Sequence, residues 1–142
     1  GQDVAHVKPH GALYNQAAKD LTLATTIASA VFDQLPTAVF FGLSGSIMMQ
    51  AAKNIGLTTA HEVFADRAYL KDGSLCPRNI EGSVFTNEES VATQVSLIIK
   101  EKKIKTIDGA VIDVAAETIC IHADTPNALT FAKTIYHLIK NK

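Results

Sequence analysis

The chain has 142 residues, of which 47% are hydrophobic, so it is long enough for a single domain (1–142) with a sizeable core. A net charge of −1, the absence of basic runs and the absence of Trp disfavour nucleic-acid binding and base-stacking surfaces. No apolar run is long enough to span a bilayer, and the N-terminus lacks a signal-peptide pattern. Cys76 and Cys120 show no CxxC spacing, which predicts free thiols and a cytoplasmic protein.

The opening segment predicts a buried strand that ends in two basic side chains. Residues 4–7 form a short, mostly apolar run, and Pro9 ends it because proline has no backbone donor. Lys8 and His10 lie two residues apart, so an extended backbone points both side chains to one face. A cation and an imidazole between a strand and a helix are typical of α/β active sites. An ordinary solvated loop explains the spacing equally well.

The next segments predict a long helix and a second strand–helix unit. A helix should follow from about Asn15, and apolar residues recur every three or four positions over 16–35. Residues 38–41 form a continuous apolar run, which is typical of a strand covered on both faces. A predicted helix over 47–54 has Gly56 as its C-cap.

The third unit begins with a predicted strand over 62–65. A long connection over 69–84 follows, and its Asp-Gly dipeptide predicts a tight turn. Thr86 and Glu89 have the spacing of a capping box, in which hydroxyl and carboxylate satisfy reciprocal backbone donors at the start of a helix. The helix that follows carries a regular apolar stripe and a lysine-rich last turn.

The last segments predict a hairpin, a strand and a final helix. Residues 105–112 surround an Asp-Gly turn, and residues 118–121 form an apolar strand. Thr125 should cap a helix whose first position is Pro126. These elements make an α/β fold of about four strand–helix units with hairpin elaborations. The crossovers are long enough for parallel strands, but a closed (β/α)₈ barrel takes about 200–250 residues, so the chain can form only a partial barrel.

Polar side chains follow each predicted strand and define a candidate site. They are Lys8 and His10, Ser44 and Ser46, Asp66 and Arg67, and His122 and Asp124. If the strands are parallel, all four groups lie at one end of the sheet, around one cleft.

Each group has a chemical role and a simpler alternative. His10 and His122 suit general acid–base catalysis, although loop histidines are often merely exposed. Asp66 and Arg67 form either a surface ion pair, or a pair in which Asp66 orients a histidine or a water and Arg67 clamps a substrate carboxylate.

Two further groups suit anionic oxygens. The turn around Gly45 offers backbone donors to an anion, or it simply caps a helix. Lys8 suits a carboxylate or a developing oxyanion. The sequence contains no GxxxxGK[ST], GxGxxG, HExxH or GxSxG pattern and no spacing of a closed metal site. An open metal site that shares His10 or His122 with further strands of a longer protein is an alternative.

Three stretches, HVKPHGALYN, VFADRAYLKDGSLCPR and TICIHADTP, resemble motifs of the LamB/YcsF lactam-utilisation family in the family's order. The resemblance runs from about Val4 to the end and covers the C-terminal part of the family pattern, because family members are longer. It departs at Ala123, where the family usually has Gly, and this matters if the backbone there needs a positive φ.

The resemblance implies a seven-stranded, deacetylase-like (β/α)-barrel. It also implies one component of an ATP-dependent 5-oxoprolinase, which opens 5-oxo-L-proline to L-glutamate with partner subunits B and C, ATP being bound together with them. We therefore expect catalytic roles for Lys8, His10, Asp66, His122 and Asp124. We expect substrate binding by Asn15, Ser44, Gly45, Ser46, Glu62 and Arg67.

Two other functions are compatible with the sequence. One is a non-catalytic scaffold subunit, and the other is a metal-dependent hydrolase of carbohydrates or amides, for which fold analogy is the only support. A partial barrel leaves strand edges and apolar surface uncovered. We therefore expect either a homo-oligomer or association with an N-terminal half-barrel.

Overall fold

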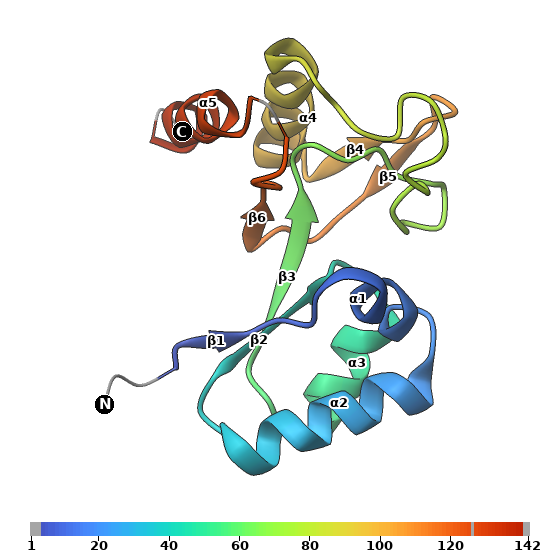
Figure 1. Cartoon of the computed structure of the whole chain (residues 1–142), viewed down its shortest axis with the longest axis vertical. Coiled ribbons are helices and arrows are strands. Elements are labelled where there is room, and N and C mark those ends of the chain that lie inside the picture. Colours follow the sequence, from blue (N-terminus) through green and yellow to red (C-terminus); the bar gives the residue numbers. More distant parts are fainter. Residues whose placement is uncertain (1–3, 126, 141–142) are drawn as a thin grey trace. The chain divides into compact units, whose positions relative to one another are not determined.

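Figure 1 shows a computed structural model of the chain, which describes residues 4–125 and 127–140. The chain forms two compact units, Gly1–Glu62 and Val63–Lys142. The boundary falls inside strand β3 (Thr59–Phe64), so one strand continues from the first unit into the second. The expectation of a single domain stays a prediction.

The main sheet contains four strands in the order β1-β2-β3-β6. They are β1 (His6–Val7), β2 (Val39–Leu43), β3 and β6 (Thr118–Cys120). Strands β1 and β2 are parallel, and so are β2 and β3. The α/β fold with parallel strands is therefore confirmed.

The first unit contains helices α1 (Gly11–Ala17), α2 (Leu21–Gln34) and α3 (Ile47–Ile55), and α2 packs against α3 (Figure 1). The predicted helix over 47–54 is confirmed, with Gly56 in the left-handed region at φ 102° as its C-cap.

The single helix predicted from about residue 15 to residue 35 is wrong. The Asp20 side chain accepts a hydrogen bond from the Leu23 N–H at 3.0 Å and starts a second helix, so the apolar stripe continues across a break in the backbone. The first helix also begins earlier, at Gly11, where φ is 60°.

The opening strand is shorter and more exposed than predicted. Only His6–Val7 pair with β2, and Val4 is 48% exposed. Among the described strands β1 lies at one end of the sheet order, so it has a neighbour on one side only. An apolar run alone does not reveal this edge position, which is why burial was overestimated.

The second unit contains helices α4 (Glu88–Glu101) and α5 (Ala128–Lys140) and the antiparallel hairpin of β4 (Lys103–Lys105) and β5 (Val111–Asp113). The predicted hairpin is confirmed. The core of this unit is formed by Ala65, Val91, Val95, Phe131 and Ile135. None of the described helices is long and apolar enough to cross a membrane.

Two predicted caps differ from the structure. Asn87, not Thr86, is the N-cap of α4, and its side chain accepts the Ser90 N–H at 2.8 Å. The capping box was therefore wrong, because asparagine competes well with threonine for this role. Thr125 was expected to cap a helix that begins at Pro126, which lies outside the described residues.

The connection from β3 to α4 contains a tight turn and an ion pair with the hairpin. Gly73 lies in the left-handed region at φ 79°, which confirms the predicted turn. Lys71 binds Asp108 of the hairpin at 2.8 Å, and this hydrogen bond lowers the pKa of the Asp108 carboxyl to about 2. Cys76 and Cys120 form no disulfide bond with each other, as predicted.

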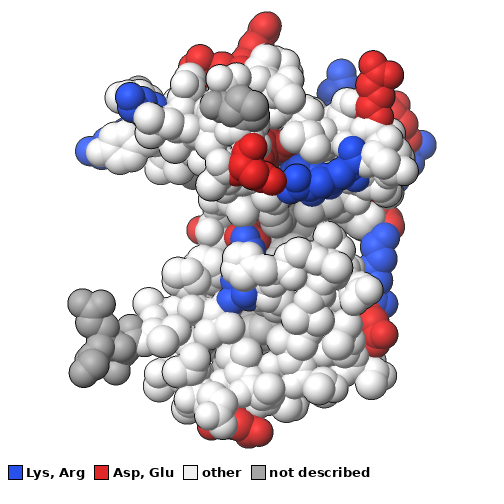
Figure 2. Space-filling model, in the orientation of Figure 1, with Lys and Arg blue, Asp and Glu red and all other residues white. Residues whose placement is uncertain are grey.

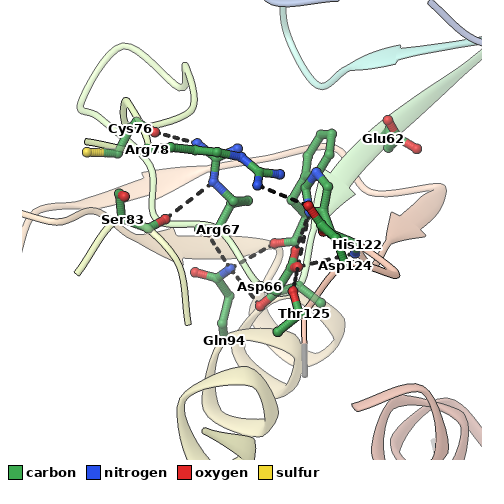
Figure 3. A network of polar contacts seen from close by, with 12 residues as sticks. Glu62, Asp66, Arg67, Cys76, Arg78, Ser83, Gln94, His122, Asp124 and Thr125 are labelled. Carbon is green, nitrogen blue, oxygen red and sulfur yellow. Dashed lines mark hydrogen bonds and ion pairs between the residues drawn. The ribbon is translucent and has the colours of Figure 1, made fainter. Parts of the chain in front are cut away.

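Gln94 of α4 anchors the start of this connection. Its Nε2 lies 2.8, 3.2 and 3.0 Å from the carbonyl oxygens of Phe64, Ala65 and Arg67, respectively, in a buried environment. Because these three carbonyls lie within two residues of Asp66 and on both sides of it, Gln94 fixes the backbone that carries this side chain (Figure 3).

We predict that Gln94→Leu lowers the free energy of unfolding by about 2–3 kcal/mol, because buried carbonyls lose their donor. Urea denaturation followed by circular dichroism measures the change. Gln50 is exposed on α3, so Gln50→Leu makes the same chemical change as a control and should stay within about 0.5 kcal/mol of the original protein. Equal effects of the two substitutions would contradict this role of Gln94.

Candidate functional site

A buried carboxylate holds an imidazole in the second unit. Asp66 is 0% exposed, and His122 Nδ1 lies 3.0 Å from both of its carboxylate oxygens (Figure 3). The backbone N–H of His122 also donates to Oδ2 of Asp66, at 3.2 Å. The two residues follow β3 and β6, which are joined by a hydrogen bond from the Ala65 N–H to the Cys120 carbonyl at 3.0 Å.

Two more side chains fix this pair. The hydroxyl of Thr125 donates to Oδ2 of Asp66 at 3.3 Å, and the Phe64 ring stacks on the His122 ring at a centroid distance of 5.4 Å. The side chain of His122 remains 24% exposed. Because Nδ1 faces a carboxylate, Nε2 is the nitrogen available to a substrate, and a neutral ring then carries its proton on Nδ1.

The Arg67 guanidinium binds backbone carbonyls of the connection from β3 to α4, in which Arg67 itself lies. Its Nε donates to the Ser83 carbonyl at 3.3 Å, and its Nη2 donates to the Cys76 carbonyl. Burial lowers the pKa of the Arg67 guanidinium from its usual range, Arg78 lowers it further, and Asp66 acts in the opposite direction. The alternative of a surface ion pair between Asp66 and Arg67 is wrong, because both residues are buried. Binding of a substrate carboxylate by Arg67 stays a prediction.

Asp124 lies at the surface. It forms an ion pair with Arg78 at 3.4 Å, in which the two side chains are 70% and 50% exposed, respectively. Such an exposed pair contributes little to stability. Ala123 does not have a positive φ, so the backbone at this position does not require glycine. A catalytic role of Asp124 stays a prediction.

A second buried carboxylate lies in the first unit. Glu62 is 2% exposed, its Oε1 lies 2.7 Å from the Lys8 ammonium, and its Oε2 accepts the Tyr14 hydroxyl at 2.8 Å. The Lys8 side chain is 16% exposed and the Glu62 side chain 3%, so Lys8 is the more accessible member of this ion pair. Its charge is balanced by a carboxylate that is itself fixed by a second donor.

The structure places His10 and Asn15 outside this network. His10 is exposed at the N-cap of α1 and makes no side-chain capping bond. The Asn15 amide donates to the Gly11 carbonyl at 3.3 Å within the same helix. Their predicted roles in catalysis and substrate binding rest on the sequence alone.

The turn at Ser44–Gly45–Ser46 already uses its backbone donors. The N–H groups of residues 44–47 donate, in order, to Glu62 O, His61 Nδ1, Leu43 O and Ala18 O. These four donors are therefore occupied within the chain, which removes the mechanism by which we expected this turn to bind an anion. The Ser46 Oγ is buried without a hydrogen-bond partner. Substrate binding by the serine side chains stays a prediction.

Sequence reasoning missed Tyr14 and Thr125 as members of the two networks. A buried tyrosine hydroxyl needs a partner, so Tyr14 beside the basic motif was a usable signal. Thr125 was assigned to helix capping, and nothing in its spacing points to Asp66. The expected arrangement of all polar groups around one cleft joins residues of both units and stays a prediction.

The described residues offer no ready metal site. Within 4–125 and 127–140, no group of three or more His, Cys, Asp or Glu side chains is placed to hold a metal ion. On the face shown in Figure 2, basic and acidic side chains are interspersed over the described residues.

Comparison with known proteins identifies the family. The LamB/YcsF family model matches residues 1–142. Two proteins named as the "A" component of 5-oxoprolinase, from Geobacillus kaustophilus and Oceanobacillus iheyensis, are each 45% identical over the whole chain, which spans 56% and 55% of their lengths. A crystal structure of a lactam utilization protein from Thermus thermophilus matches with a TM-score of 0.86 and 38% identity, over 96% of this chain and 54% of that one.

The chain thus spans about half the length of the relatives it matches. The structural match confirms the α/β fold, in which β1, β2 and β3 are parallel, and it extends over nearly all of the chain. Because the family model also covers the chain from end to end, the protein belongs to the LamB/YcsF family.

Proposed function

We propose that this chain takes part in opening the lactam ring of 5-oxo-L-proline to L-glutamate, as the "A" component of an ATP-dependent 5-oxoprolinase or as a piece of it. The names of its relatives support this reaction. The observation that carries the proposal is the buried Asp66 carboxylate, which holds a partly exposed His122 ring by Nδ1.

Hydrolysis of a lactam needs three things from a protein. A water must lose a proton as it attacks, the tetrahedral oxyanion must be stabilised, and the ring nitrogen must receive a proton as it leaves. His122 Nε2 takes the proton from water and returns it to the nitrogen. Asp66 holds the ring in the required tautomer and stabilises the imidazolium that forms between these steps.

Lys8 supplies the positive charge for an anionic oxygen of the substrate, since its side chain is 16% exposed and its ammonium is held by Glu62 at 2.7 Å. Arg67 donates to the carbonyl oxygens of Ser83 and Cys76, and binding of the substrate carboxylate by its guanidinium stays a prediction. ATP is bound together with partner subunits B and C, and two cysteines that are not joined in a disulfide suit a cytoplasmic enzyme. An N-terminal half-barrel or a second copy of the chain covers the open strand edges.

The proposal is tested by mixing the purified chain with subunits B and C, ATP and 5-oxoproline, and by measuring glutamate. The expected result is glutamate release that requires all four additions. Glutamate release that is unchanged when the chain is left out, or absent when every component is present, would contradict the proposal.

In the same assay, His122→Ala should lower turnover about a hundredfold or more, since the proton transfers lose their carrier. The control is His137→Ala, which removes an exposed histidine from the last turn of α5. Circular dichroism verifies that both variants fold. Normal turnover of His122→Ala would remove His122 from the mechanism.

The Asp66 contact also predicts the tautomer of His122. Long-range ¹H–¹⁵N spectra above the titration range of histidine should show the proton on Nδ1, because this nitrogen faces the carboxylate. Asp66→Asn should abolish this preference. Asp124→Asn should leave it unchanged, because Asp124 binds Arg78 at the surface. A proton found on Nε2 in the original protein would refute the assigned geometry.

A further inference from the structure

Tyr14 of the short helix α1 is buried beside the ion pair of Lys8 and Glu62. It is 3% exposed in α1, its hydroxyl donates to Oε2 of Glu62 at 2.8 Å, and its ring centroid lies 5.6 Å from the Lys8 ammonium. The phenol therefore contacts both members of the Lys8–Glu62 ion pair, by a hydrogen bond on one side and by the face of its ring on the other.

We propose that Tyr14 is a positioning residue, which holds the Glu62 carboxylate so that the Lys8 ammonium is fixed toward an anionic oxygen of the substrate. This proposal rests on the proposed function, in which Lys8 meets that oxygen. It adds a residue to the reaction that acts through two others rather than by touching the substrate.

The geometry of the carboxylate explains why a second donor matters. The last torsion of a glutamate is broad, so a carboxylate with one partner rotates easily. Glu62 is 2% exposed, and its two oxygens are bound by different donors, Lys8 at 2.7 Å and Tyr14 at 2.8 Å. The phenol therefore holds one oxygen of the carboxylate while the ammonium binds the other.

The three residues of this network differ in how much of each is exposed to solvent. The Lys8 side chain is 16% exposed and the Glu62 side chain 3%, while Tyr14 as a residue is 3% exposed. Glu62 and Tyr14 are therefore more deeply buried than the Lys8 side chain, which is the part of this network that solvent reaches most. The effect of the Lys8 ammonium on a ligand depends on how firmly the two buried groups hold it.

The chain offers a matched pair of substitutions. Tyr14→Phe keeps the ring near the ammonium and removes only the hydroxyl. Tyr136 is 53% exposed on α5, and its ring lies 4.9 Å from the Lys140 ammonium, so Tyr136→Phe removes a hydroxyl from a second tyrosine beside a lysine. The two variants differ in the presence of a buried carboxylate partner.

The first experiment is a double-mutant cycle in the assembled enzyme, with Tyr14→Phe, Lys8→Ala and the double variant. Tyr14→Phe should lower kcat/KM about tenfold, since a hydrogen bond to a charged group is lost. It should cause no further loss when Lys8 is already alanine. An equal loss in both backgrounds, or an equal loss in Tyr136→Phe, would overturn the proposal.

Comparison of 5-oxoproline with 2-pyrrolidinone, which lacks the carboxylate, identifies the anionic oxygen. If Lys8 binds the carboxylate, Tyr14→Phe raises KM for 5-oxoproline and leaves 2-pyrrolidinone unaffected. If Lys8 binds the oxyanion, kcat falls for both compounds. Either result supports the positioning role, and a variant with unchanged kinetics on both compounds would refute it.

The second experiment does not depend on activity. Hydrogen exchange of lysine ammonium groups, measured by NMR on the chain, should be slowest for Lys8 and should accelerate several-fold in Tyr14→Phe but not in Tyr136→Phe. Unchanged exchange of Lys8 would overturn the positioning role. If the original protein releases no glutamate with its partners, the proposed function fails, and the exchange rates still decide whether Tyr14 fixes Lys8.

Discussion

Burial of carboxylates is the constraint on which the candidate chemistry depends. An ionised carboxylate that is removed from water must be paired and hydrogen-bonded, or the chain must lose stability. Each unit meets this requirement with a basic partner: Glu62 binds Lys8 and Tyr14, and Asp66 binds His122. The same contacts that make these acids tolerable therefore fix a cation and an imidazole in defined orientations.

The strands and turns with strong local signals could be predicted from the sequence. A continuous apolar run identified β2, Gly56 identified the end of α3, and an Asp-Gly turn identified the hairpin of β4 and β5. The errors arose where two local signals compete. The apolar stripe of a helix continues from α1 into α2, and only the capping contact of Asp20 shows that the backbone breaks between them.

The sequence indicated residues of the candidate site, but not which of them contact one another. The sequence indicated that Asp66 orients a histidine or a water, and the structure identifies His122 as its partner, 56 positions along the chain. Such a long-range partner leaves no local pattern. The same limit applies to Arg67, whose sequence suggests a ligand clamp, whereas its contacts lie with carbonyls of its own connection. Sequence periodicity reports faces of elements, not the direction of a buried side chain.

The central claim is that His122, held by Asp66, meets the substrate through Nε2. A crystal structure of the protein with 5-oxoproline bound tests this most directly. The account predicts that the lactam, or a water in contact with its carbonyl carbon, lies within hydrogen-bond distance of His122 Nε2, about 2.7–3.2 Å, while Nδ1 stays on Asp66. A ligand bound away from His122, or a ring that has left Asp66 in the complex, would contradict it.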